Sequence, residues 1–298
     1  MYDVIVIGAG PAGLQAALTL GRMHRRTLLL DSGEYRNKPV AHMHNVLGAD
    51  GMPPAEFRAT AREQLRAYRS VEFATGRVER VEGEADEFRV VFPDGCTESA
   101  RRIVLATGLA DDLPEVAGLE GLWGRRAFAC PFCDGHEFSG ARIGVIGAGP
   151  AAAHVLALLR PIVDAATVFA VGEPTRREDR AEIERHGGTV HDAPVTAVRA
   201  HRGGVRVTAG EDALDVAGLF VAGGAFRQRA PFAAQLGLRM LPSGAIEIDE
   251  FGRTSVTGVS AAGDLAHRAS LPGPMASVML AAAAGQVAAS WIVQELSL

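Results

Sequence analysis

Cysteine is scarce in this chain, which has only 3 among its 298 residues. Three thiols are too few for the disulfide framework of a small secreted protein. Two of them, Cys130 and Cys133, lie three residues apart, so the pair is a candidate for metal binding or for redox catalysis. The third, Cys96, lies in the sequence PDGC, which predicts the turn of a β-hairpin, and we expect no chemistry from it.

The chain also lacks an excess of either charge and any long hydrophobic run. Its 30 Lys and Arg residues against 35 Asp and Glu residues give a formal net charge of -5, which offers neither nucleic acid nor an anionic membrane an attractive surface. The apolar N-terminal run has no Lys or Arg before it and breaks at Gly8, and the later apolar segment 281–293 contains Gln286 and Ser290. We therefore predict neither a signal peptide nor a membrane span, and we expect a cytoplasmic protein.

One glycine-rich sequence occurs twice in the same context. The segment YDVIVIGAGPAGLQAALTL, residues 2–20, is echoed by ARIGVIGAGPAAAHVLALL, residues 141–159. Each copy predicts a strand, a glycine turn and a helix, which is how a dinucleotide-binding domain begins. The two copies are too far apart for a solenoid repeat, so they predict two complete domains in one chain.

The predicted fold class is α/β, with two Rossmann-like three-layer domains of which the second is inserted into the first. A block from about Leu238 to the end, including an alanine-rich helix from about Met275 to Leu296, resembles neither repeat and is expected to complete the first domain. The first domain is then residues 1–112 plus 238–298. The second is residues 113–237, which carry the cysteine pair.

The first glycine motif is predicted to bind a dinucleotide. Gly8 permits the tight turn, Gly10 lets a pyrophosphate approach the backbone, and Gly13 lets the helix pack closely on the strand. The phosphates are expected at the N-terminus of the helix. Asp31 ends the next strand, where its carboxylate is placed to accept hydrogen bonds from ribose hydroxyls. The whole motif consists of Gly8, Gly10, Pro11, Ala12 and Gly13.

The second glycine motif is less complete. It matches the GxGxxA variant, but Val171 stands where Asp31 stands in the first copy. Arg176 and Arg177 follow closely, either to meet the 2′-phosphate of NADPH or as part of the solvated face of a helix. Use of NADPH, of NADH or of neither therefore stays open. The residues that would contact the nucleotide are Gly147, Gly149, Ala152, Arg176 and Arg177.

The cysteine pair is predicted to form a reversible disulfide. Zinc would require two further ligands, and the chain has no second CxxC or HxxxH partner. If Cys133 opens a helix, the amides and dipole of that helix favour a thiolate. Asp134 and His136 follow directly and are candidates for the proton carrier that thiol–disulfide exchange needs.

The order of these motifs resembles the low-molecular-weight thioredoxin reductase family of flavoprotein disulfide oxidoreductases, from end to end. The matching segments are GAGPAG, Ala106-Thr107-Gly108, CPFCDG just before GAGPAA, and Ala262-Gly263-Asp264. The resemblance implies a homodimer with FAD in the first domain, the first glycine motif and Asp31 on its ADP half. It also implies that Cys133 faces the flavin, that Cys130 is the interchange thiol and that Asp134 is the acid–base residue. Further flavin contacts that it implies are Asn45, Thr107, Gly108, Gly263, Asp264, Met275 and Ala276.

Departures from the family pattern favour its dithiol oxidase branch, of the gliotoxin and holomycin type. The Arg residues expected after the second domain's second strand are replaced by Val171-Gly172-Glu173, and the Arg-Gln pair beside the flavin is replaced by LPGPMAS near Pro272. GHE after the cysteine pair and RNKPVAHMHN, residues 36–45, are more like that branch. Its members close small dithiols into disulfides with oxygen as acceptor, and many have His where this chain has Asp134.

Three functions are therefore weighed. Oxidation of a small dithiol is favoured, and NAD(P)H-dependent reduction of thioredoxin or a similar protein is the alternative that the retained GxGxxA motif supports. A non-catalytic flavin redox sensor ranks lowest, because a proton carrier beside a dithiol is a catalytic arrangement. The substrate cleft has no readable motif, and its candidates by elimination are His42, His44 and the segment near Pro272.

Overall fold

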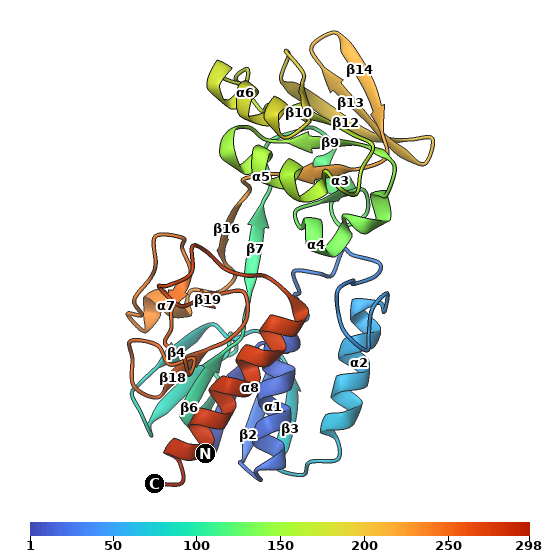
Figure 1. The fold of residues 1–298 in the computed structure, drawn as a ribbon. Helices are drawn as coiled ribbons and strands as arrows, with labels where there is room; N and C mark the ends of the chain where they lie inside the picture. The colour runs from blue at the N-terminus through green and yellow to red at the C-terminus, as the bar shows by residue number, and fades with distance from the viewer. The chain divides into compact units, whose positions relative to one another are not determined.

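The computed structural model describes residues 1–298 and divides into two compact units. The first unit comprises Met1–Lys38, Pro54–Ala110 and Phe226–Leu298, and the second comprises Pro39–Pro53 and Asp111–Ala225. Figure 1 follows the chain by colour, and both termini belong to the first unit. No sequence signal pointed to the grouping of the loop Pro39–Pro53 with the second unit.

A seven-stranded sheet forms the centre of the first unit, in the order β3-β2-β1-β6-β5-β4, with β18 also paired to β6. Strands β1, β2, β3, β6 and β18 form its parallel pairs, and β4, β5 and β6 pair antiparallel. Residues Val4, Ile5 and Val6 are fully buried, as expected of a parallel strand that is covered on both faces. The strands are β1 (Tyr2–Ile7), β2 (Thr27–Asp31), β3 (Val71–Thr75), β4 (Arg80–Glu82), β5 (Phe88–Val91), β6 (Thr97–Leu105) and β18 (Val259–Ala261).

Helices α1 (Pro11–Arg22) and α8 (Val278–Glu295) lie side by side in the first unit (Figure 1). A Cβ atom added at Gly285 of α8 would lie 2.0 Å from the carbonyl oxygen of Ala12, so the close packing of the two helices requires glycine there. The helix predicted from about Met275 begins at Val278, because Ser277 is extended and forms its N-cap position. The other helices of the unit are α2 (Pro54–Leu65) and α7 (Phe232–Gln235).

The second unit contains a five-stranded parallel sheet in the order β11-β10-β9-β15-β8 and an antiparallel sheet of three strands. The parallel strands are β8 (Ala127–Phe128), β9 (Arg142–Ile146), β10 (Ala165–Phe169), β11 (Thr189–Val190) and β15 (Leu219–Val221). The antiparallel strands are β12 (Val195–His201), β13 (Gly204–Ala209) and β14 (Asp212–Val216). The helices are α3 (Leu119–Leu122), α4 (Pro131–Asp134), the 3-10 helix η1 (His136–Phe138), α5 (Gly149–Leu159) and α6 (Arg177–Arg185).

Two short two-stranded sheets complete the fold. The connecting strands β7 (Leu109–Asp112) and β16 (Ala225–Gln228) pair with each other, and β17 (Ile246–Glu247) pairs with β19 (Ala266–His267). None of the helices combines the length and hydrophobicity that a membrane crossing requires. The α/β class with two nucleotide-binding sheets is thus confirmed.

Candidate active site

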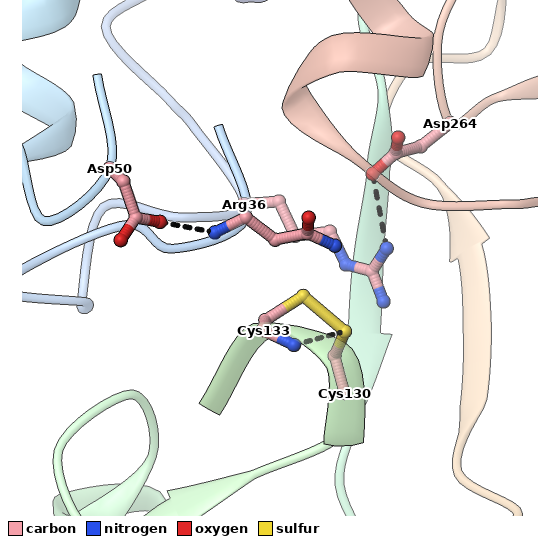
Figure 2. The surroundings of a disulfide bond; sticks show 6 residues. Arg36, Asp50, Cys130, Cys133 and Asp264 are labelled. Atoms are coloured by element: carbon pink, nitrogen blue, oxygen red, sulfur yellow. Dashed lines mark hydrogen bonds and ion pairs between the residues drawn. A yellow bond between two sulfur atoms is a disulfide. The ribbon is translucent and has the colours of Figure 1, made fainter. Parts of the chain in front are cut away.

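The cysteine pair forms a disulfide at the start of helix α4, with the Cα atoms of Cys130 and Cys133 5.3 Å apart (Figure 2). Cys133 does not open this helix. Cys130 takes the N-cap position and Pro131 is the first helical residue, a place that proline favours because it needs no amide hydrogen there. The amide of Cys133 donates to the sulfur of Cys130 over 3.2 Å, which favours negative charge on Cys130 when the disulfide is open.

The carboxyl group of Asp134, the expected proton carrier, has a raised pKa. Burial and the nearby Glu137 carboxylate raise the pKa of Asp134 to about 7, and the His44 imidazole partly opposes them. A carboxyl group with this pKa exchanges protons readily near neutral pH. The other candidate, His136, is exposed on η1 and its side chain has no hydrogen bond or ion pair.

The loop Pro39–Pro53 brings His44 close to Glu137. Its Nε2 lies 3.6 Å from Oε1 of Glu137, and its Nδ1 lies 3.9 Å from Oδ2 of Asp50. Of the two histidines considered for the substrate cleft, only His44 joins ion pairs. His42 is exposed and joins none. No sequence pattern indicated that Glu137 or Asp50 would pair with His44.

The first glycine motif forms an open cradle at the N-terminus of α1. A Cβ atom on Gly13 would lie 1.8 Å from the carbonyl oxygen of Gly8, so a side chain there would push the helix off the strand. A Cβ atom on Gly10 would meet nothing within 4 Å. The helix has no side-chain cap and no acidic residue in its first turn, so its free amides are available to an anion. This cradle fits the phosphates of a dinucleotide.

Asp31 ends β2 as predicted and is buried, but protein groups already surround its carboxylate. Its Oδ1 accepts a hydrogen bond of 2.9 Å from the amide of Gly33, and its Oδ2 accepts hydrogen bonds from Tyr35 and Arg62. A carboxylate has about four acceptor positions. One position is therefore left for a ribose hydroxyl. Partial burial, followed by the hydrogen bond to Asp31, raises the pKa of the Tyr35 hydroxyl to about 12.

The remaining flavin-site candidates of the first unit follow the same edge of its sheet. Because Ile7, Leu105 and Ala261 are in register across β1, β6 and β18, the residues after each strand meet at that edge. Asp264 also forms an ion pair of 3.1 Å with Arg36, which the sequence did not indicate (Figure 2). These candidates are Thr107, Gly108, Gly263 and Asp264, while Met275 and Ala276 are exposed just before α8 and Asn45 lies in the loop of the second unit.

The turn of the second glycine motif differs from the first because a carboxylate lies next to it. The backbone of Gly149 is left-handed, with φ +63°, and the carboxylate of Asp179 lies against it, 3.5 Å from where a Cβ atom would be. Gly147 packs closely on the backbone of Ala222, and Ala152 is buried. A carboxylate at this turn repels the phosphates of a nicotinamide nucleotide, so the charge of the site does not fit that cofactor.

The two arginines near this turn are not arranged as a phosphate site. Arg176 is exposed, and its guanidinium pairs with Glu178 at 3.5 Å and with Asp179 at 3.4 Å. Arg177 is exposed at the first position of α6. Their interpretation as part of a solvated helix face is the one that this geometry favours.

Comparisons with known proteins agree with the fold and the disulfide. A family model described as pyridine nucleotide-disulphide oxidoreductase matches residues 2–288. The thioredoxin reductase tcpT of Claviceps purpurea is 32% identical over 318 residues, covering 100% of this chain and 96% of that protein. The crystal structure of the oxidoreductase from Agrobacterium tumefaciens is 35% identical with a TM-score of 0.89, covering 99% of this chain and 98% of that one. The crystal structure of HlmI is also 35% identical, with a TM-score of 0.88, covering 99% of this chain and 92% of that one.

These matches extend over almost the whole chain, and the matched range spans Cys130 and Cys133. FAD is the cofactor that membership in this family implies, and the cradle at Gly10 fits its phosphates. The chain belongs to the pyridine nucleotide-disulphide oxidoreductase family and is a flavoprotein disulfide oxidoreductase of the thioredoxin reductase type.

Proposed function

We propose that this enzyme oxidises a small-molecule dithiol to a disulfide through Cys130 and Cys133, with oxygen as the final electron acceptor. The observation that carries the direction of electron flow is the carboxylate of Asp179 against Gly149. It puts negative charge where a nicotinamide nucleotide would place its phosphates, and the chain has Val171 instead of an acidic ribose ligand. The carboxylate opposes both NADPH and NADH as the electron donor, and the missing acidic ligand opposes NADH.

The chain's own residues account for the exchange chemistry. Asp134 takes the proton of one substrate thiol, and the resulting thiolate attacks the sulfur of Cys130. The bond between Cys130 and Cys133 breaks, and Cys133 leaves as a thiolate. Asp134 releases the first proton to solvent and then takes the proton of the second substrate thiol, which attacks the mixed disulfide at the substrate's own sulfur. The bond to Cys130 breaks, the substrate disulfide forms, and Cys130 leaves with the proton that Asp134 returns. Two electrons have then passed from the substrate to the cysteine pair.

The first unit would hold FAD. The amides at Gly10 and the start of α1 bind its phosphates, and Asp31 offers its remaining acceptor position to the ribose. When bound, FAD supplies the two-electron acceptor that restores the disulfide and delivers the electrons to oxygen. The residues assigned to it are Gly8, Gly10, Pro11, Ala12, Gly13, Asp31, Asn45, Thr107, Gly108, Gly263, Asp264, Met275 and Ala276.

Reduction of thioredoxin or a related protein by NADPH or NADH is the second candidate. It is supported by the retained glycines at Gly147 and Gly149 and by relatives such as tcpT that are named thioredoxin reductases. In that function the electrons run in the opposite direction, from the nucleotide to the cysteine pair. A homodimer is part of either proposal and stays a prediction.

Anaerobic spectroscopy of the flavin-loaded protein distinguishes the two. We expect dithiothreitol to bleach the flavin absorbance band rapidly and NADPH and NADH to leave it unchanged. Rapid bleaching by NADPH would overturn the oxidase proposal and favour the reductase. A protein that no dithiol and no nucleotide reduces would instead be a redox sensor without turnover.

A further inference from the structure

A buried arginine lies beside the carboxylate that is expected to bind the adenosine ribose of FAD. Arg58 of α2 is only 7% exposed and forms no ion pair. Its Nη1 donates a hydrogen bond of 3.1 Å to Oδ1 of Asn37, and its guanidinium carbon lies 3.8 Å from the centroid of the Tyr35 ring. Burial of a charge costs stability unless neighbouring groups compensate it. The Asn37 amide and the Tyr35 ring are the groups that do so here.

The hydroxyl group of Tyr35 is held as closely as its ring. It donates a hydrogen bond to Oδ2 of Asp31 and accepts one from Nη2 of Arg62. The same nitrogen of Arg62 also donates to Oδ2 of Asp31, so the three groups form a closed cycle of hydrogen bonds. Arg62 in turn lies over the ring of Phe73, with its guanidinium carbon 4.9 Å from the ring centroid. The position of the Tyr35 oxygen is therefore fixed by contacts at both ends of the side chain.

Asp31 alone has too few free acceptor positions for a ribose. The adenosine ribose of FAD has two neighbouring hydroxyl groups, and each donates one hydrogen bond. Oδ2 of Asp31 already accepts from Tyr35 and Arg62, and Oδ1 accepts from the amide of Gly33. A carboxylate has about four acceptor positions, so one is left, on Oδ1. Asp31 can bind one ribose hydroxyl, and the other requires a different acceptor at the end of β2.

We propose, given that FAD is the cofactor in the proposed function, that the hydroxyl oxygen of Tyr35 is the second ribose acceptor and that Arg58 and Arg62 position it. A hydroxyl oxygen has two lone pairs, and Arg62 uses one of them. The hydroxyl hydrogen of Tyr35 is donated to Asp31, so this group serves the ribose only as an acceptor. The ligand class that fits is an adenine nucleotide with both ribose hydroxyls intact.

The experiment measures, by isothermal titration, how tightly the full-length, flavin-free protein binds ADP, 2′-deoxy-ADP and 3′-deoxy-ADP. ADP keeps the ribose and the pyrophosphate of FAD and lacks the flavin. One hydrogen bond changes affinity by about two- to tenfold, so the wild type should prefer ADP to each deoxynucleotide by about that factor. Tyr35→Phe should lose the preference over one deoxynucleotide and keep the preference over the other.

Tyr68→Phe is the matched control. The Tyr68 hydroxyl accepts a hydrogen bond of 3.1 Å from Arg22, at the opposite end of α1 from the glycine cradle, so this variant should keep both preferences. Tyr35→Phe also frees an acceptor position on Oδ2 of Asp31. If Tyr35 only blocked that position, the variant would bind ADP more tightly than the wild type. Tighter binding of ADP by Tyr35→Phe, or loss of neither preference, would overturn the inference.

Arg58→Lys tests the positioning of Tyr35 and keeps the positive charge. Lysine has no planar group to lie on the ring, so the preference that Tyr35→Phe loses should fall in this variant as well. Arg66→Lys is its control, because Arg66 is 78% exposed just after the same helix, and the preference should not change. A purely structural role of Arg58 predicts equal weakening for ADP and both deoxynucleotides, and that result would contradict the positioning.

A second measurement uses the flavin-loaded protein. The release of FAD after dilution is followed by the rise in flavin fluorescence. We expect Tyr35→Phe to release FAD about two- to tenfold faster than the wild type, and Tyr68→Phe to release it at the wild-type rate. Equal rates for Tyr35→Phe and the wild type would overturn the inference even if the protein oxidises dithiols. If Tyr35→Phe behaves as expected but no dithiol is oxidised, the ribose assignment stands and the proposed function fails.

Discussion

Replacing Asp179 by Asn should raise the affinity of the protein for nicotinamide nucleotides. The substitution removes one negative charge at the Gly149 turn and keeps the size of the side chain. The left-handed backbone of Gly149 and the close packing of Gly147 on Ala222 stay as they are. The change therefore removes the carboxylate charge, together with its ion pair to Arg176, from a turn that otherwise has the shape of a nucleotide site.

The size of the effect follows from Coulomb's law. Two unit charges about 5 Å apart interact by about 0.8 kcal/mol in water and by about 3 kcal/mol at an effective dielectric constant of about 20. The side chain of Asp179 is only 14% exposed, so the repulsion of a phosphate lies between these limits. We therefore expect binding to tighten by between about fourfold and about 160-fold for each phosphate charge near the turn.

Isothermal titration of the oxidised, flavin-loaded protein with NADP⁺ and NAD⁺ measures this directly. Both nucleotides should bind more tightly to Asp179→Asn, since both carry the pyrophosphate. Glu178→Gln is the matched control, because Glu178 pairs with the same Arg176 but is 75% exposed. The reasoning is refuted if the wild type already binds NADP⁺ tightly, or if Asp179→Asn binds it no better than Glu178→Gln.

Four further substitutions test the disulfide, the proton carrier and the flavin cradle. Cys130→Ser should abolish anaerobic flavin bleaching by dithiothreitol, whereas Cys96→Ser, which alters an exposed thiol, should not; full activity of Cys130→Ser would disprove its role. Asp134→Asn should slow bleaching by about 10² to 10⁴. The same substitution should raise the melting temperature more at pH 8 than at pH 4. The pKa of Asp134 is about 7 in the folded protein and 3.8 in the unfolded chain, so the wild-type protein loses stability as the pH rises between these values. An equal rise in melting temperature at both pH values would contradict this. Gly13→Ala should destabilise the protein by about 1–3 kcal/mol in chemical denaturation. Gly10→Ala should leave the stability of the flavin-free protein unchanged and weaken the binding of flavin. The opposite pattern would contradict the assignment of Gly10 to phosphate binding.

Local patterns predicted those features that depend on neighbouring residues. The strand, turn and helix around Gly8, the place of Asp31 at the end of β2 and the pairing of the two cysteines follow from spacing, since each involves residues close in the chain. The start of α4 was also readable. Pro131 favours the first helical position, and it takes that position here.

Features that depend on distant residues had no signal in the sequence. His44 and Glu137 meet because a loop joins the second unit, and nothing in their own neighbourhoods indicates a partner. Asp179 belongs to a helix whose charge pattern predicts a solvated face, yet its side chain turns toward Gly149. In the same way, no sequence pattern indicated that Arg62 of α2 pairs with Asp31. Tertiary packing decides each of these contacts.

The most direct test of the proposed function is turnover in air without any nicotinamide nucleotide. The purified flavin-loaded protein is supplied with dithiothreitol, and the disulfide and hydrogen peroxide are measured together. Dithiol oxidation through Cys130 and Cys133 with oxygen as acceptor predicts one peroxide for each disulfide formed, and no dependence on added NADPH. A protein that is inactive with dithiol and air, and that transfers electrons to disulfides only when NADPH or NADH is present, would contradict it.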